Sequence, residues 1–127
     1  MPPQRPPNLG KWGESLAKRY LERKGWRIVA ENFRVHQHAE IDLIAEDGST
    51  LVFVEVKTRR SHTLETAYDA WTPKKKKAMR LAIEIFLMNY TASYEALRID
   101  WLVLRYYPET QGDVASASID HIQGLVL

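Results

Sequence analysis

The sequence predicts an α/β fold in which helices flank a mixed sheet, with elements in the order α-β-β-β-α-β-β. Three observations lead to this: two segments carry apolar residues at helical spacing, five shorter segments read as strands, and one helical segment follows the third strand. With 127 residues, 45% of them hydrophobic, the chain has the size and composition of one folded domain. We expect that domain to span residues 9–127, after a loose proline-rich tail at residues 1–8.

The first helix is predicted over residues 9–24. Gly25 is a plausible stop after two basic residues. Glu14 lies at the border of the apolar face, so its carboxylate can point along the edge of the core. The apolar face itself consists of Trp12, Leu16, Ala17, Tyr20 and Leu21.

Three strand segments follow, at residues 26–30, 39–45 and 51–58, and the first has an irregular continuation to residue 35 as an option. The third segment is the most informative. Its even positions are apolar throughout, whereas its odd positions change from apolar to charged at Glu55 and Lys57. This pattern favours a central strand that ends at a cleft over an exposed edge strand.

The turn between the second and third strands leaves two registers open. If Gly48 and Ser49 are the turn residues, Asp42 lies directly opposite Glu55. If the turn is Asp47-Gly48 instead, Glu40 lies opposite Glu55 and Asp42 is diagonal to it. Both registers place these carboxylates on one face of the sheet.

The second helix is predicted over residues 73–90, after a polar connection at residues 59–71. Thr72 and Pro73 suit the N-cap and the first helical position. Because the helix is apolar nearly all round, we expect it to be buried on more than one side. A fourth strand at residues 97–106, a loop at 111–118 and a short last strand at 119–122 complete the chain.

Four consecutive lysines, Lys74, Lys75, Lys76 and Lys77, stand in the first turn of that second helix. Cations at a helix N-terminus oppose the helix dipole, and a phosphate backbone would offset this cost. The alternative is an ordinary solvated face, since four successive helical residues cannot all point to one partner. We name as candidate nucleic-acid contacts these lysines together with Arg59 and Arg60.

Carboxylates on adjacent strands, next to a lysine, are suited to metal-assisted phosphodiester hydrolysis. In that interpretation Asp42 and Glu55 ligate Mg²⁺, for which Mn²⁺ can substitute, and the carbonyl of Val56 supplies a further oxygen. Lys57 would steer or deprotonate the attacking water, or stabilise the developing negative charge. Glu14 would bind the metal or its water shell, and Glu40 is a further candidate. The alternative is a solvated or ion-paired surface.

The amino-acid composition excludes several classes of protein function. The chain has no cysteine, which excludes disulfides, thiolate catalysis and cysteine-ligated zinc. No apolar run reaches membrane-spanning length, and the first eight residues lack the apolar core of a signal peptide. We therefore expect a soluble, cytoplasmic protein. The net charge of +2 does not by itself indicate a nucleic-acid partner.

Three stretches together resemble the YraN-like family of small bacterial proteins: residues 10–17 (GKWGESLA), 40–45 (EIDLIA) and 51–59 (LVFVEVKTR). The segment at residues 98–100 and the pair His121-Ile122 also look similar. That family is similar to archaeal Holliday-junction resolvases and belongs to the PD-(D/E)xK nuclease superfamily.

The resemblance implies a restriction-endonuclease-like core that uses Mg²⁺, with Glu14, Asp42, Glu55 and Lys57 on the active-site positions. It implies branched or structured DNA as substrate and a homodimer as the working form. A nucleic-acid-binding module with this fold but no turnover is the alternative, and an interaction protein with a purely structural acidic pocket is the third hypothesis.

Overall fold

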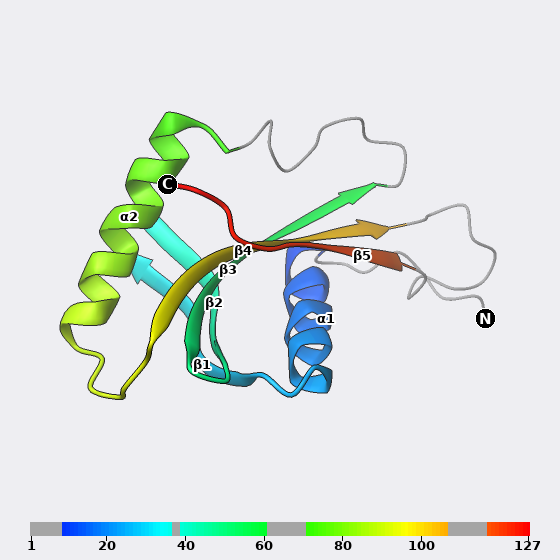
Figure 1. The fold of residues 1–127 in the computed structure, drawn as a ribbon. Coiled ribbons are helices and arrows are strands. Elements are labelled where there is room, and N and C mark those ends of the chain that lie inside the picture. The colour runs from blue at the N-terminus through cyan, green and yellow to red at the C-terminus, as the bar shows by residue number, and fades with distance from the viewer. Residues whose placement is uncertain (1–8, 37–38, 61–70, 107–116) are drawn as a thin grey trace.

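The computed structural model describes residues 9–36, 39–60, 71–106 and 117–127. Its five strands form one sheet in the order β1-β2-β3-β4-β5, with α1 against one face and α2 against the other (Figure 1). The elements are α1 (Leu9–Arg23), β1 (Arg27–Val35), β2 (Ala39–Asp47), β3 (Thr50–Arg60), α2 (Pro73–Met88), β4 (Ala96–Tyr106) and β5 (Ala117–Ile122). The predicted fold class and element order are confirmed. The predicted tail at residues 1–8 and most of the two predicted loops lie outside the described residues.

The sheet is mixed because β3 and β4 pair in parallel, whereas every other neighbouring pair is antiparallel. Parallel neighbours need a crossover connection, and α2 lies within the connection between these two strands. β3 is therefore the central strand, as its apolar pattern predicted. It pairs with β4 as far as Arg60↔Tyr106, so Arg59 and Arg60 belong to the strand and not to the polar connection expected there.

The β2–β3 turn settles the register that the sequence left open. Asp47 pairs with Thr50, so Gly48 and Ser49 are the two turn residues. Gly48 has a φ of +60°, a conformation that glycine adopts without the steric cost that a Cβ brings. The alternative turn at Asp47-Gly48 is wrong.

Each face of the sheet has its own apolar core. On the α1 side, Ala17 and Leu21 are buried against β2, β3 and β4. On the α2 side, Met79, Ala82 and Ile83 are buried against residues of β2, β3 and β4 such as Phe53. The two helices thereby fix the central strand from both sides.

The second helix begins as the sequence predicted. The Oγ1 of Thr72 accepts a 3.2 Å hydrogen bond from the backbone N–H of Lys75, and Pro73 takes the first helical position. The prediction of burial on several sides is wrong, because α2 packs against one face of the sheet. Leu81 is 43% exposed and Met88 is 80% exposed. Neither α1 nor α2 is long and apolar enough to cross a membrane.

Candidate functional site

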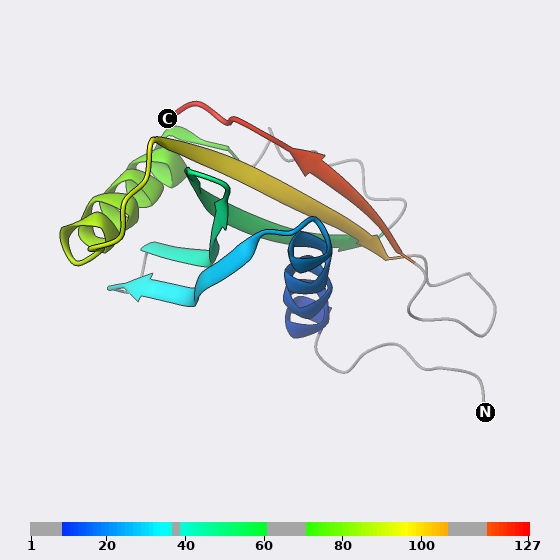
Figure 2. The ribbon, with the colours of Figure 1, turned by 60° about the horizontal axis from the view of Figure 1, so that its bottom comes forward.

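The candidate site lies where β2 and β3 separate. Their backbone pairing runs from Asp47↔Thr50 to Leu43↔Val54 and goes no further, although both strands continue. Beyond that point the β1–β2 hairpin bends away from β3 (Figure 2). Asp42 is the first residue of β2 past the last pair, and its Oδ2 accepts a 2.7 Å hydrogen bond from the backbone N–H of Val56. Its carboxylate is thus fixed in the opening between the strands.

The strand β2 changes face at Asp42. Ile41 packs in the core on the α2 side, whereas Leu43 packs in the core on the α1 side. In a regular strand, residues two apart share a face. On β1, Asn32 lies between the partners of these two residues and has a φ of +50°, a left-handed conformation that asparagine tolerates. Because of this irregularity, Asp42 packs in neither of the two apolar cores.

Glu55 is buried, with a side chain that is 5% exposed. Its Oε1 lies 2.9 Å from the ammonium nitrogen of Lys75 and 3.8 Å from that of Lys57. Its Oε2 is also buried but has no hydrogen-bond partner among the described residues. A buried carboxylate oxygen without a hydrogen-bond partner destabilises the folded state, so we expect a hydrogen-bond donor or a cation to bind this atom.

The two acids affect each other electrostatically. The pKa of Asp42 is raised from its ordinary 3.8 to about 7, first by burial and second by the nearby charge of Glu55. The Val56 N–H works against this rise in pKa, as does the Lys75 ammonium, while Glu40 adds to it. A dication beside Asp42 would favour the ionised form of this carboxylate.

An open cavity of about 570 Å³ lies beside Asp42 on the α1 side, and Glu55 is not part of its lining. Burial raises the pKa of Glu14, and Asp42 is the second cause, so these two acids interact across the cavity. Glu40 faces the same space and forms an ion pair of 3.2 Å with Arg34. We call this space the acidic cavity. It is lined by Leu9, Gly10, Lys11, Glu14, Asn32, Arg34, Glu40, Asp42, Val56, Lys57, Thr58 and Arg59.

Within the described residues, no group of three or more histidine or acidic side chains is close enough to hold one ion. Asp42, Glu55 and Glu14 therefore do not form a single first coordination sphere. Asp42 interacts electrostatically with Glu55, which does not line the cavity, and with Glu14, which does. We call Asp42 and Glu55 the acidic pair. The donor set of carboxylate and carbonyl oxygens suits a hard cation that keeps several of its waters, as Mg²⁺ does.

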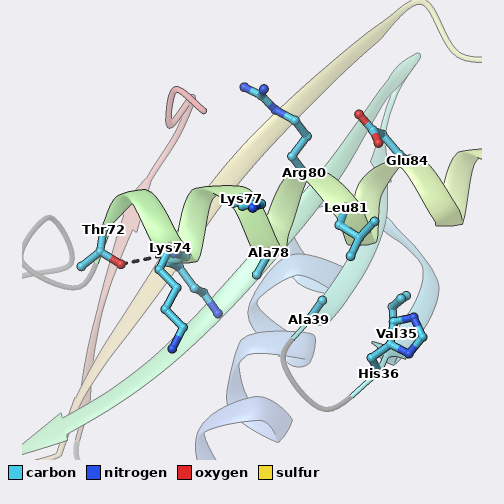
Figure 3. A pocket seen from close by; sticks show the side chains of 11 residues that line it. Val35, His36, Ala39, Thr72, Lys74, Lys77, Ala78, Arg80, Leu81 and Glu84 are labelled. Atoms are coloured by element: carbon cyan, nitrogen blue, oxygen red, sulfur yellow. Dashed lines mark hydrogen bonds between the residues drawn. The ribbon is translucent and has the colours of Figure 1, made fainter.

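A second and larger groove, of about 1150 Å³, lies between α2 and the end of the β1–β2 hairpin (Figure 3). Three of the four predicted lysines line it, and Lys76 does not. Apolar residues, among them Val35, Ala39 and Leu81, form part of its wall. We call it the basic groove, after the cations Lys74, Lys75, Lys77 and Arg80 that line it.

Sequence reasoning missed one residue here and placed two others differently. Arg80 was not among the candidates, although its spacing of three from Lys77 puts both on one helix side. Lys75 was expected to contact only nucleic acid, yet it contacts Glu55. Arg59 lines the acidic cavity and not the basic groove. The side chain of Arg60 lies outside the described part of the chain.

Comparison with known proteins gives a consistent family assignment. The family model described as "Uncharacterised protein family UPF0102" matches residues 13–104. A UPF0102 protein of Chlorobium chlorochromatii is 37% identical over 122 residues, which cover 96% of this chain and 93% of that protein. UPF0102 proteins of Syntrophomonas wolfei and Mycolicibacterium vanbaalenii are 36% and 34% identical, over 88% and 92% of this chain and 85% and 92% of their own lengths.

Proposed function

The chain belongs to the uncharacterised protein family UPF0102, and we propose that it is a Mg²⁺-dependent endonuclease that hydrolyses phosphodiester bonds in branched or structured DNA. Membership confirms the resemblance drawn from the sequence motifs. One observation carries the proposal: Asp42 and Glu55 interact at the opening between β2 and β3, and a buried oxygen of Glu55 has no hydrogen-bond partner among the described residues. That combination favours a cation at this position.

The residues present fit Mg²⁺. Asp42 and Glu55 would hold it directly, the carbonyl of Val56 would add an oxygen, and Glu14 would bind one of its waters. A bound Mg²⁺ supplies charge neutralisation at a phosphate and a water of lowered pKa. The hydrogen bond from the Val56 N–H fixes the orientation of the Asp42 carboxylate, which suits a metal ligand.

Lys57 is placed to act on the phosphate. It lines the same cavity as Asp42, and its ammonium nitrogen lies 3.8 Å from Oε1 of Glu55 and 5.7 Å from the ring centre of Trp101. From this position it would donate to a phosphate oxygen and stabilise the negative charge that develops as water attacks. Neutralising the residue should therefore lower the rate of the chemical step more than the affinity for substrate.

The substrate class follows from the charges around the site. The basic groove offers Lys74, Lys77 and Arg80 to phosphates, whereas the chain carries no base-reading motif. We therefore propose recognition of backbone and shape. A chain of this size would cut two strands symmetrically as a homodimer, which light scattering with and without DNA tests directly.

The experiment is cleavage of labelled four-way junctions, flaps and single strands in Mg²⁺ or Mn²⁺. The negative control is the double variant D42A/E55A, and the matched control is E22Q/D120N, which removes two exposed acids that line neither the acidic cavity nor the basic groove. We expect the wild type and E22Q/D120N to cleave. Cleavage by the wild type no greater than that by D42A/E55A would refute the proposal.

The basic groove also supports the alternative of a binding module without turnover. It is lined by four cations, but neither Asp42 nor Glu55 takes part in it, so phosphate binding and hydrolysis use different residues. This alternative expects salt-sensitive DNA binding with no cleavage of any substrate. The same cleavage experiment, paired with a binding measurement, separates the two functions.

A further inference from the structure

We propose that the Lys75 ammonium is the counter-ion of Glu55 in the metal-free protein, and that a divalent metal ion displaces it into the basic groove, where it binds a substrate phosphate. Metal binding and nucleic-acid binding are then coupled through one side chain. The inference rests on the proposed function and adds to it a link between the acidic pair and the basic groove.

The first support is the contact itself. Lys75 reaches from α2 to β3, and its nitrogen lies 2.9 Å from Oε1 of Glu55, closer than the 3.8 Å of Lys57. Glu55 is 5% exposed and Lys75 is 28% exposed. The buried carboxylate therefore needs this ammonium when no other cation is present, because an uncompensated buried charge is strongly destabilising.

The second support is that Lys75 connects Glu55 to the basic groove. It contacts a residue of the acidic pair, and it also lines the basic groove beside Lys74 and Lys77. Its backbone N–H donates to the N-cap Thr72, which anchors the main chain, and the charge stands at the end of a flexible four-carbon side chain. A change of rotamer is then sufficient to move the charge.

The third support is electrostatic. A dication bound to Oε2 of Glu55 would repel an ammonium held on Oε1 of the same carboxylate, and the repulsion is strong in a poorly solvated site. The influence of Lys75 also reaches Asp42, so its charge opposes a metal ion at both acids. Nearby, the anionic backbone of a nucleic acid in the groove offers Lys75 a replacement partner.

Thermodynamic linkage requires metal binding and phosphate binding to affect each other equally. If metal releases Lys75 for phosphate, then phosphate must by the same free energy release Glu55 for metal. A protein built in this way holds its metal weakly until substrate arrives. Lys77 is the control, because it lines the groove but is not among the ion-pair partners of Glu55 in the described part of the chain.

The test is calorimetric titration of Mn²⁺ into the full-length wild type and the variants K75Q, K75R and K77Q, without DNA. Glutamine keeps an N–H donor but loses the charge, so K75Q should bind Mn²⁺ about 3- to 10-fold more tightly than the wild type. K75R and K77Q should remain close to the wild type. Equal or weaker binding by K75Q overturns the inference, whereas a wild type that binds no Mn²⁺ overturns the proposed function as well.

A second measurement uses the wild type alone, in case K75Q does not fold. The side-chain ammonium signal of Lys75 is followed by ¹⁵N NMR, with K75R used only for assignment. Saturating Mg²⁺ should shift this signal or abolish it through faster exchange with solvent, and a short single-stranded oligonucleotide should then restore a protected signal. A Lys75 signal that Mg²⁺ leaves unchanged contradicts displacement.

Discussion

Oδ2 of Asp42 accepts a 2.7 Å hydrogen bond from the backbone N–H of Val56, at the point where β2 stops pairing with β3. A side chain thus accepts the backbone hydrogen bond at this point, and the contact fixes the half-buried carboxylate of Asp42 in the opening between the strands. The arrangement raises the pKa of Asp42 to about 7. It makes the site sensitive both to pH and to cations.

The first prediction concerns stability against pH without metal. A carboxyl whose pKa rises from 3.8 to about 7 on folding contributes stability that is fully present below pH 3.8 and is lost as pH rises through 7. Asparagine keeps the oxygen that accepts from Val56 but carries no charge. D42N should therefore be more stable than the wild type at pH 8, by roughly 2–4 kcal/mol.

Denaturant unfolding in EDTA at pH 4 and at pH 8 measures this difference. The advantage of D42N should shrink at pH 4, where Asp42 is protonated in the folded wild type. The exposed-site variant E22Q is the control and should follow the wild type at both values. A D42N protein that is less stable than the wild type at pH 8 would contradict the raised pKa.

The second prediction concerns metal and stability. Because a ligand that binds only the folded state stabilises it, Mg²⁺ at ten times its dissociation constant should add about 1.4 kcal/mol at pH 8. E55Q should abolish this gain, whereas E14Q should only reduce it, since we propose that Glu14 binds a water of the metal ion and not the ion itself. Thermal unfolding with Mg²⁺ or EDTA measures it. An undiminished gain in E55Q would place the metal elsewhere.

The third prediction concerns the contact between α1 and β3. A Cβ added to Gly13 would lie 2.0 Å from Oγ1 and 3.2 Å from Cβ of Thr58. G13A should therefore push the helix off the strand, and the net loss should be about 1–2 kcal/mol despite alanine's better helix propensity. Denaturant unfolding measures this loss.

The double variant G13A/T58A tests the cause of that loss. Removing Oγ1 and Cγ2 of Thr58 should recover part of the stability, whereas G13A/T58S, which keeps Oγ1, should recover less. Because Glu14 follows Gly13 on α1, G13A should also weaken metal binding. Equal stability of all three variants would show that this contact is unimportant.

The fourth prediction concerns the basic groove. K74A/K77A should weaken binding to single-stranded and branched DNA and lower the salt slope of the affinity by about 1.4–2, as expected for two lost phosphate contacts. The matched control is R19A/R23A, which removes two exposed cations from α1, away from the groove. Fluorescence anisotropy across a salt series measures both. Equal slopes for the two variants would argue against the groove.

Local patterns in the sequence predicted the elements and the central position of β3. The alternation of Val52, Val54 and Val56 marks a buried strand face, and Thr72-Pro73 marks a helix start. Of the site residues Asp42, Glu55 and Lys57, the last two could be predicted from that same alternation, because they occupy its odd positions. The position of Asp42 relative to Glu55 depends on the turn between β2 and β3, for which the sequence left two registers open.

Other features depend on tertiary geometry and had no local signal. Lys75 meets Glu55 only because the β3–β4 crossover brings the start of α2 over the central strand. The change of face at Asp42 breaks the period-two rule on which strand predictions depend. The exposure of Leu81 reflects a helix that covers one sheet face, which composition alone does not reveal.

The central claim is that Asp42 and Glu55 share one divalent cation. The most direct measurement is a crystal of the wild-type protein soaked in Mn²⁺ and examined by anomalous diffraction. The account predicts a peak within about 2.0–2.3 Å of an oxygen of Asp42 and of Oε2 of Glu55, with Lys75 turned away from Oε1. A fully soaked crystal with no peak between these two carboxylates, and with Lys75 still on Glu55, would contradict it.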